Sequence, residues 1–240
     1  MKENKEDLIH SLYYDPYKSN KHKYFFRIKM EHIDKIWGLT NKQLMLLINI
    51  WIYNKEKNKY KLSNKELNSV DFVEEKFKIC KSKSNISTHL KKIEKLELIS
   101  INGPNKKRNF SYDFNEKSNN FRSIPLVKIL HWLKVSDSER EFKTYIYLLF
   151  KFYNDNRGGN GAFGKRKVTI SNSDLGEKLD LSAGTIGNHC RKIVDLGLLD
   201  VEKSSGKTNT YYLPYYSDGK KIYAAKTRSS EKIPDSFKTN

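Results

Sequence analysis

Apolar residues recur with helical spacing in two stretches of the chain that lie 100 residues apart. The two apolar stripes are Ile86, Leu90, Ile93 and Leu96, and Ile186, Cys190, Ile193 and Leu196. Spacings of three and four residues place side chains on one face of an α-helix. Each stretch is therefore predicted to be an amphipathic helix with one buried face.

The similarity of the two stretches extends beyond the stripes. Between 82–112 and 182–212 the same residue recurs at ten of thirty-one positions. The shared residues are Ser82/Ser182, Ile86/Ile186, His89/His189, Lys92/Lys192, Ile93/Ile193, Leu96/Leu196, Leu98/Leu198, Lys107/Lys207, Asn109/Asn209 and Tyr112/Tyr212. In each copy the helix precedes a short strand, a polar loop and a second strand. The pattern predicts one structural unit that occurs twice.

Further elements upstream follow the same order in both copies. Extended segments (24–30 and 121–126) and short helices (31–37 and 127–134) precede strongly apolar helices. Thr40 with Gln43 is typical of a capping box at the start of the first apolar helix, and Ser136 or Asp137 is expected to cap the second. Helices this apolar must be buried on most of their circumference.

A short helix that follows Ser63 in the first copy and Ser171 in the second lies at an offset of 108 residues. The second copy has a longer loop before this helix, and the first copy has a longer loop after it. The loops nearly compensate each other, so the offset of 100 is accidental while the order of elements is not.

We predict an α+β fold, mainly α, with two domains, because 240 residues suffice for two cores of ordinary size. The predicted segments are a polar N-terminal arm (1–23), a first domain (24–114), a linker rich in Asn and Ser (115–120), a second domain (121–214) and a loose C-terminal tail (215–240).

The outward face of the second amphipathic helix carries small and polar residues. Ser182 is expected to cap this helix after a turn at 180–181. Gly184 and Gly187 each cost up to about 1 kcal/mol of helix stability relative to alanine, which indicates a steric demand. A helix in the major groove of DNA needs small residues for close approach and polar groups for bases and phosphates. Candidate DNA-binding residues here are Ala183, Gly184, Thr185, Gly187, Asn188, Arg191 and Lys192.

The first amphipathic helix has a more basic outward face. Its candidate DNA-binding residues are Lys83, Ser84, Asn85, Ser87, Thr88, Lys91 and Lys92. Basic loops follow each helix at 102–108 and 204–209, where they would reach phosphates or a minor groove. Candidate residues of the loops are Lys106, Lys107, Arg108, Lys207 and Asn209. An ordinary solvated helix face and plain hairpin turns are the alternative interpretations.

Charge supports a polyanionic partner. The chain has 46 Lys and Arg against 28 Asp and Glu, a net charge of +18, and both halves share the excess. Basic side chains that neutralise phosphates release condensed counterions, which favours nucleic-acid binding. A lysine-rich surface that only maintains solubility is the alternative.

Catalytic, metal and cofactor sites are not indicated. Cys80 and Cys190 are the only cysteines, and His89 and His189 lack ligands at metal spacing, so we expect half-buried histidines that support their helices. The segment 159–166 resembles a phosphate-binding loop, but its last residue is Arg and it precedes a strand rather than a helix. We expect no enzyme activity, no cofactor and no metal.

The chain contains no apolar run long enough to span a bilayer, and its first residues lack the apolar stretch of a signal peptide. We therefore expect no membrane partner and a cytoplasmic protein.

The stretches 182–199 and 84–99 resemble the recognition helix and following strand of winged-helix domains. Two such domains in a basic chain look like the replication initiators of plasmids and phages. This resemblance implies two winged helix-turn-helix domains in tandem that bind double-stranded DNA at repeated origin sites. It also implies contacts with replication machinery.

Two other functions remain open. A transcription regulator would have the same fold and contact transcription machinery, and in a protein-binding adaptor one winged helix would bind a partner. A homodimer is possible in each case.

Overall fold

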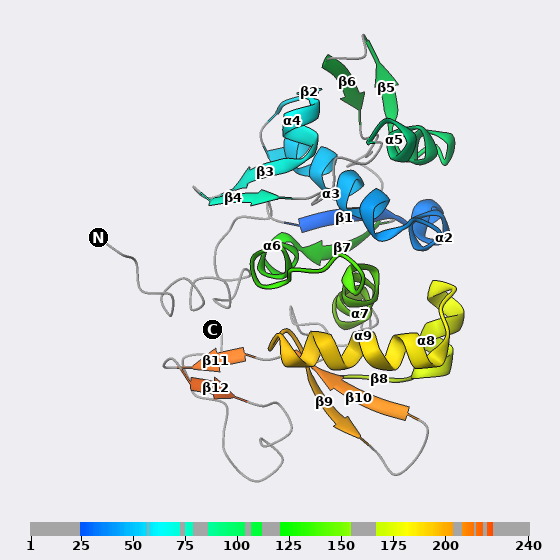
Figure 1. Ribbon diagram of the computed structural model, residues 1–240, viewed down its shortest axis with the longest axis vertical. Helices are drawn as coiled ribbons and strands as arrows, with labels where there is room; N and C mark the ends of the chain where they lie inside the picture. Colours follow the sequence, from blue (N-terminus) through cyan, green and yellow to red (C-terminus); the bar gives the residue numbers. More distant parts are fainter. Residues whose placement is uncertain are drawn as a thin grey trace.

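The computed structural model describes residues 25–56, 58–72, 75–78, 86–103, 107–111, 121–154, 167–203, 208–213, 215–217 and 220–222. They form a mixed α+β structure (Figure 1). The first half of the chain contains β1 (Phe25–Lys29), the 3-10 helix η1 (Met30–His32), α2 (Ile33–Trp37), α3 (Asn41–Glu56), β2 (Lys61–Ser63), α4 (Asn64–Leu67), β3 (Ser69–Phe72), β4 (Glu75–Lys78), α5 (Ile86–Lys95), β5 (Ser100–Asn102) and β6 (Lys107–Ser111).

The second half repeats this order with few differences. It contains β7 (Phe121–Pro125), α6 (Leu126–Val135), α7 (Phe142–Asn154), β8 (Lys167–Ser171), α8 (Asn172–Leu179), α9 (Ala183–Asp195), β9 (Asp200–Lys203), β10 (Thr208–Tyr212), β11 (Tyr215–Ser217) and β12 (Lys220–Ile222).

Each half has a small antiparallel sheet of the same topology. The strand order is β2-β6-β5 in the first half and β8-β10-β9 in the second. In both sheets the strand that precedes the helices pairs with the last strand of the hairpin that follows them. The predicted repeat is therefore present in the arrangement of the strands as well as in their order.

The two halves are joined by their first strands. β1 pairs with β7 in antiparallel register, with Arg27 opposite Ser123 at the centre. Because equivalent strands pair antiparallel, an approximate two-fold axis through this pair relates the halves. Figure 1 shows the equivalent helices α2 and α6 on opposite sides of the β1–β7 pair. The equivalent helices α4 and α8 also lie on opposite sides of it.

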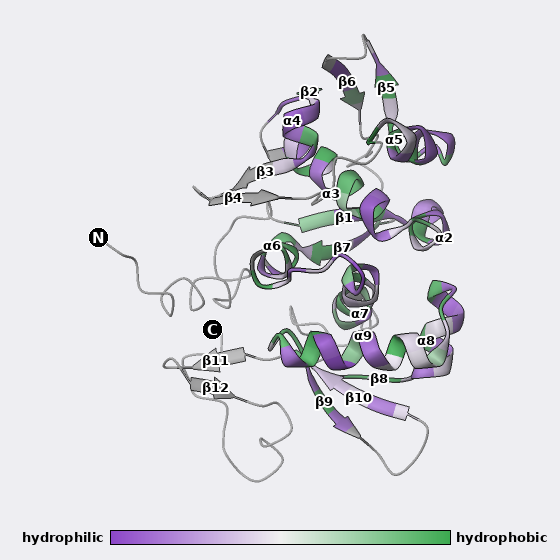
Figure 2. Cartoon of the chain, in the orientation of Figure 1, coloured by the Kyte–Doolittle hydropathy of each residue, from purple (hydrophilic) through white to green (hydrophobic). Residues whose placement is uncertain are grey.

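Buried apolar side chains of both halves form one cluster in the described part of the chain. Every residue from Gln43 to Asn54 on α3 is buried, which confirms the expectation from its composition. Figure 2 shows hydrophobic residues on β1 and β7 between the halves and hydrophilic residues on much of α4 and α5. The outer elements are thus polar and the junction of the halves is apolar.

Of the caps predicted for the two strongly apolar helices, one is correct. The Thr40 N–H donates to Gln43 Oε1 at 2.9 Å, and the Gln43 N–H donates to Thr40 Oγ1 at 3.4 Å, which confirms the capping box. The cap at Ser136 or Asp137 is wrong, because α7 begins only at Phe142 and Ser136 bonds within a turn to Ser138.

Two hairpins differ from the expectation. The longer loop of the first copy contains the β3–β4 hairpin, and the segment expected to be a loose tail contains the short β11–β12 hairpin. The predicted arm 1–23, linker 115–120 and phosphate-loop-like segment 159–166 lie outside the described residues.

Candidate nucleic-acid interface

α5 and α9 end in the same hydrogen-bonded turn. The Leu98 N–H donates to the Ile93 carbonyl at 3.3 Å, and the Leu198 N–H donates to the Ile193 carbonyl at 3.2 Å. The residue before each leucine has a left-handed conformation, with φ of 59° at Glu97 and 70° at Gly197. This geometry is a Schellman motif, which satisfies carbonyl groups at a helix end. Both helices therefore lead into their hairpins in the same way.

The turn between α8 and α9 is tight. Asp180 adopts a left-handed conformation with φ of 55°, and the Leu181 N–H donates to the Gly176 carbonyl at 2.9 Å. A Cβ atom at Gly176 would lie 2.4 Å from the Leu181 carbonyl oxygen, so only glycine fits there. Ser182 Oγ accepts the Thr185 N–H at 3.1 Å, which confirms the predicted turn and cap.

The apolar stripes of both helices are directed into the protein. Ile186, Cys190 and Ile193 of α9 are buried, as are the equivalent residues of α5. Burial raises the pKa of the Cys190 thiol, so this cysteine packs as a neutral side chain. The opposite faces of α5 and α9 remain available for a partner.

The outward face of α9 is open at its N-terminal end. The exposed residues among the candidates on this helix are Ala183, Gly184, Asn188, Arg191 and Lys192. Around a Cβ atom placed at Gly184, only Ser182 Oγ comes within 4.0 Å. Nothing in the described part of the protein therefore requires a glycine at 184. Thr185 is half-buried, and its hydroxyl lies 2.8 Å from Ser182 Oγ.

Gly187 has a different environment from Gly184. It is half-buried, and a Cβ atom there would lie 3.1 Å from Asn172 Nδ2 at the start of α8. The small size of residue 187 is therefore explained by packing within the protein. A steric demand from a bound partner therefore stays a prediction at Gly184, where the protein itself leaves open space.

The outward face of α5 carries more lysine. Thr88, Lys91 and Lys92 are exposed, and Ser87 is half-buried because Arg108 Nη2 of β6 donates to Ser87 Oγ at 2.9 Å. The structure thus brings a residue of the predicted basic loop against the predicted helix face. The candidates that fall outside the described residues are Lys83, Ser84, Asn85, Lys106 and Lys207.

The sheet register corrects the alignment of the hairpins. Leu62 lies opposite Arg108 in the first sheet, and its counterpart Ile170 lies opposite Asn209 in the second. Asn209 is therefore equivalent to Arg108 and not to Asn109, since the second hairpin loop is one residue longer. Lys107 belongs to β6 rather than to a loop.

Asn209 is bound inside its own half. Its Nδ2 donates to Asn172 Oδ1 at 3.1 Å and to the Tyr211 hydroxyl oxygen at 3.2 Å. The Tyr211 hydroxyl also donates to Asn172 Oδ1 at 3.3 Å. Asn172 therefore joins the sheet to α8 and lies against α9 at Gly187. Sequence reasoning missed Asn172, although the repeated Ser-Asn pair at Ser63 and Ser171 was a signal for it.

The histidines shared by the two copies are both half-buried, and His189 contacts the core helix α7. His189 Nδ1 lies 2.9 Å from Thr144 Oγ1 of α7. Burial lowers the pKa of His189, and the nearby Glu141 raises it in part. Burial and then the charge of Lys42 lower the pKa of His89, which is half-buried on α5. Both rings are half-buried as expected, and the contact with Thr144 confirms the supporting role for His189.

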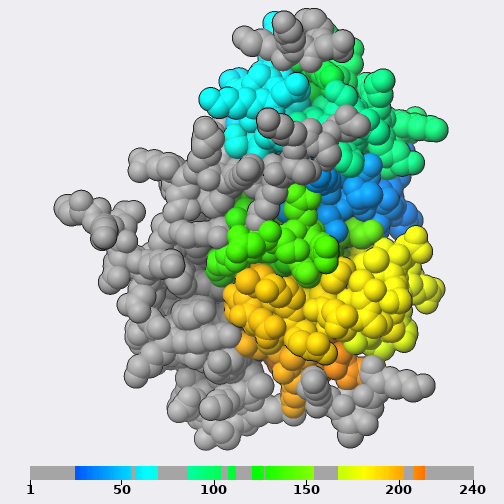
Figure 3. Space-filling view, viewed as in Figure 1, coloured from blue at the N-terminus to red at the C-terminus, as the bar shows by residue number. Residues whose placement is uncertain are grey.

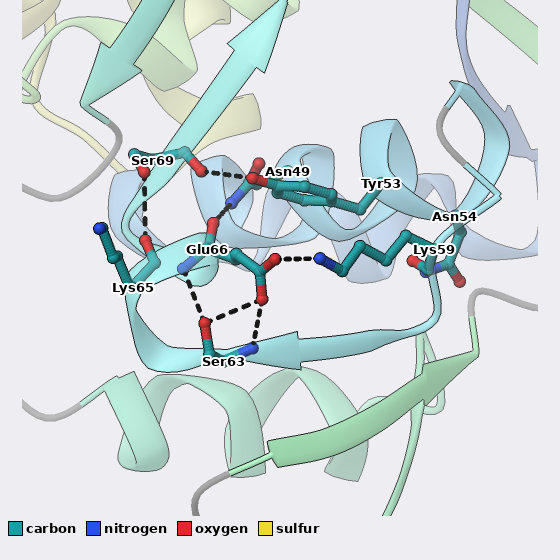
Figure 4. Close-up of polar contacts among 8 residues, drawn as sticks. All are labelled: Asn49, Tyr53, Asn54, Lys59, Ser63, Lys65, Glu66 and Ser69. Atoms are coloured by element: carbon teal, nitrogen blue, oxygen red, sulfur yellow. Dashed lines mark hydrogen bonds and ion pairs between the residues drawn. The ribbon is translucent and has the colours of Figure 1, made fainter.

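A polar network positions α4 in the first half (Figure 4). Ser63 and Glu66 form a capping box, and Lys59 pairs with the Glu66 carboxylate. Burial alone would raise the pKa of Glu66, but the hydrogen bonds from Lys59 and Ser63 lower it to about 2. From α3, the buried Asn49 Nδ2 donates to the carbonyls of Glu66 at 2.9 Å and Leu67 at 3.1 Å. These bonds fix α4 on α3.

Figure 3 shows α8 and α9 side by side on the lower half of one face of the molecule, with α5 at its upper right. Among the described residues no helix is both long and apolar enough to cross a membrane, and no group of three or more His, Cys, Asp or Glu could hold a metal ion. Comparisons of the chain with protein-family models, curated proteins and solved structures gave no match.

Proposed function

We propose that the protein binds double-stranded DNA sequence-specifically through two winged helices, with α5 and α9 as recognition helices. The observation that carries the proposal is the duplicated unit. In each half a helix with a polar outward face precedes a β-hairpin, and an earlier strand of the same half pairs with that hairpin to form a three-stranded sheet. Helices that read DNA in this fold present such a face to the major groove.

The two helices have different chemistry. The exposed amide of Asn188 is suited to hydrogen bonding with an adenine edge, and Gly184 leaves room for close approach. The exposed Lys91 and Lys92 of α5 are suited to phosphates, because ammonium groups neutralise them without reading sequence. The exposed position that holds Asn188 on α9 holds Thr88 on α5, so the proposed target consists of two different half-sites.

The approximate two-fold relation of the halves has a consequence for the target. Two recognition helices related by a two-fold axis read half-sites in opposite orientation, commonly one helical turn or roughly 34 to 36 Å apart. We expect a footprint of about 20 base pairs with weak inverted symmetry. Binding rather than catalysis is the proposed activity, with no cofactor or metal.

Initiation of replication at repeated sites is the proposed biological role, since the resemblance to plasmid and phage initiators points to it. A transcription regulator would use the same surface. The location of the bound sites, at an origin or at a promoter, distinguishes these roles.

Selection of bound duplexes from a random library with the full chain tests the proposal. We expect enrichment of one sequence with two separate protected segments in a footprint. Arg191→Ala with Lys192→Ala, and separately Lys91→Ala with Lys92→Ala, should each weaken binding of the selected duplex. A library without enrichment, or binding that does not weaken with salt, would contradict the proposal.

A further inference from the structure

Lys143 of α7 bridges the two halves of the protein. Its Nζ donates to the carbonyl of Trp37 at 3.2 Å and to the carbonyl of Leu179 at 3.1 Å. Trp37 is the last residue of α2 in the first half, and Leu179 is the last residue of α8 in the second. A cation at a helix C-terminus satisfies free carbonyls and the negative end of the helix dipole. One ammonium group therefore joins two helix ends.

The backbone of the same residue is also held by the other half. The Lys143 N–H donates to Asn41 Oδ1 at 2.7 Å, and Asn41 Nδ2 donates to the Arg140 carbonyl at 2.9 Å. Asn41 is the first residue of α3 in the first half, and its side chain caps α7 of the second half. The N-termini of two equivalent helices thus meet at the approximate two-fold axis.

Aromatic packing closes the same junction. The ring of Trp37 packs edge-on against Tyr147 and Phe150 of α7, with centroid distances of 4.9 and 5.4 Å. Partial burial lowers the pKa of Lys143 and the nearby Asp180 raises it in part, while the two carbonyls that accept from Nζ offset the cost of burying the ammonium group.

Contacts from this junction reach both recognition helices. On one side, Lys35 of α2 pairs at 2.9 Å with Glu97, which lies two residues after the end of α5. On the other side, Leu179 leads through the tight turn at Asp180 into α9, and Thr144, next to Lys143, contacts His189. Lys143 is therefore the point where the supports of α5 and α9 meet.

We propose that Lys143 is a positioning residue that fixes the separation of α5 and α9 and thereby the spacing of the two DNA half-sites that the protein accepts. The part that concerns DNA rests on the proposed function. Two linked binding modules gain affinity only when the geometry lets both engage at once, so a rigid junction makes binding selective for spacing.

The first experiment measures geometry without DNA. Spin labels on Thr88→Cys and Asn188→Cys, in a chain with Cys80→Ser and Cys190→Ser, report the distance between α5 and α9. We expect a narrow distribution for the parent chain and a clearly broader one after Lys143→Met. The matched control Lys65→Met removes one exposed charge from α4 and should leave the distribution narrow. An unchanged distribution in Lys143→Met overturns the proposal.

The second experiment uses the selected duplex with one to three base pairs inserted or removed between its protected segments. We expect the wild type to lose about tenfold or more in affinity for one added base pair, and Lys143→Met to lose less than about threefold. A spacing profile of Lys143→Met that matches the wild type overturns the proposal. If Lys143→Met fails to fold, Asn41→Ala removes a bond of the same junction and is expected to give the same two results.

The two experiments separate the hypotheses. If the wild type binds no selected duplex while the distance distribution broadens as expected, the proposed function is wrong and the positioning role of Lys143 within the protein stands.

Discussion

Glu97 and Gly197 occupy the same place in the two halves, each in a left-handed conformation two residues after the end of its helix. Such a conformation is nearly free for glycine and strained for residues with a Cβ atom. The first half therefore tolerates a strain that the second half avoids. The Glu97 side chain forms an ion pair with Lys35, a contact that glycine at 197 cannot form.

This difference predicts opposite effects of two glycine substitutions in the second half. Gly197→Ala should lower the free energy of unfolding by about 1 kcal/mol, because alanine is strained at φ of 70°. Gly184→Ala, the matched control, should raise it by up to about 1 kcal/mol, because the helix gains propensity and the site is open. Urea unfolding of both variants measures the effects, and a Gly197→Ala chain as stable as the wild type would contradict the strain.

The lysines of α5 are predicted to contribute affinity without sequence preference. Each phosphate contact that is lost lowers the slope of log K against log salt by about 0.9. Lys91→Gln with Lys92→Gln should therefore reduce the slope by about 1 to 2 and weaken selected and unrelated duplexes alike. Titrations at several salt concentrations measure this, with Lys65→Gln as the control for a lost charge on α4. An unchanged slope would mean that α5 does not contact phosphates.

Asn188 and Thr88 lie at equivalent, exposed positions of α9 and α5. Asn188→Ala should cost about 1 to 3 kcal/mol on the selected duplex and little on unrelated DNA, because an amide reads a base edge. Thr88→Ala should cost less on the selected duplex. Competition binding with single-base variants of the site measures both. Equal losses on selected and unrelated DNA would assign Asn188 to the backbone instead of a base.

The sequence predicted the helices and strands well because their signals are local. The stripes of α5 and α9, the caps at Thr40 and Ser182, and the turn at Asp180 each depend on residues a few positions apart. Buried faces follow directly from apolar spacing. These features are confirmed with small shifts at the ends of the elements.

Contacts between the halves were not predictable from such signals. The pairing of β1 with β7 joins segments almost 100 residues apart, and the sequence of neither strand identifies the strand that it pairs with. The start of α7 was misplaced for the same reason. Its cap is the side chain of Asn41 from the other half, so no capping residue was needed in the local sequence.

The candidate site was predictable to the level of a helix face, but not to that of a side chain. Gly187 and Asn209 were predicted from their positions to contact DNA, and that prediction did not reveal that both lie against Asn172. The identity of Asn109 and Asn209 was misleading because one added loop residue shifts the register. Only the sheet pairing reveals this shift.

The supporting histidines predict a pH dependence of stability between neutral and mildly acidic pH. Burial lowers the folded-state pKa of both His89 and His189 below the usual value. Above the unfolded-state pKa of about 6.5 both states are neutral and the stabilisation is complete. As the pH falls through that value, the unfolded chain takes up protons first, and stability decreases until the folded-state pKa is passed.

The double variant His89→Asn, His189→Asn should be less stable at pH 8 but lose less stability than the wild type between pH 8 and pH 5. Thr144→Ala removes the His189 contact while keeping both rings, so its unfolding free energy should still fall with pH. Urea unfolding at each pH measures these slopes, and parallel curves for the wild type and the double variant would show that the two rings do not cause the dependence.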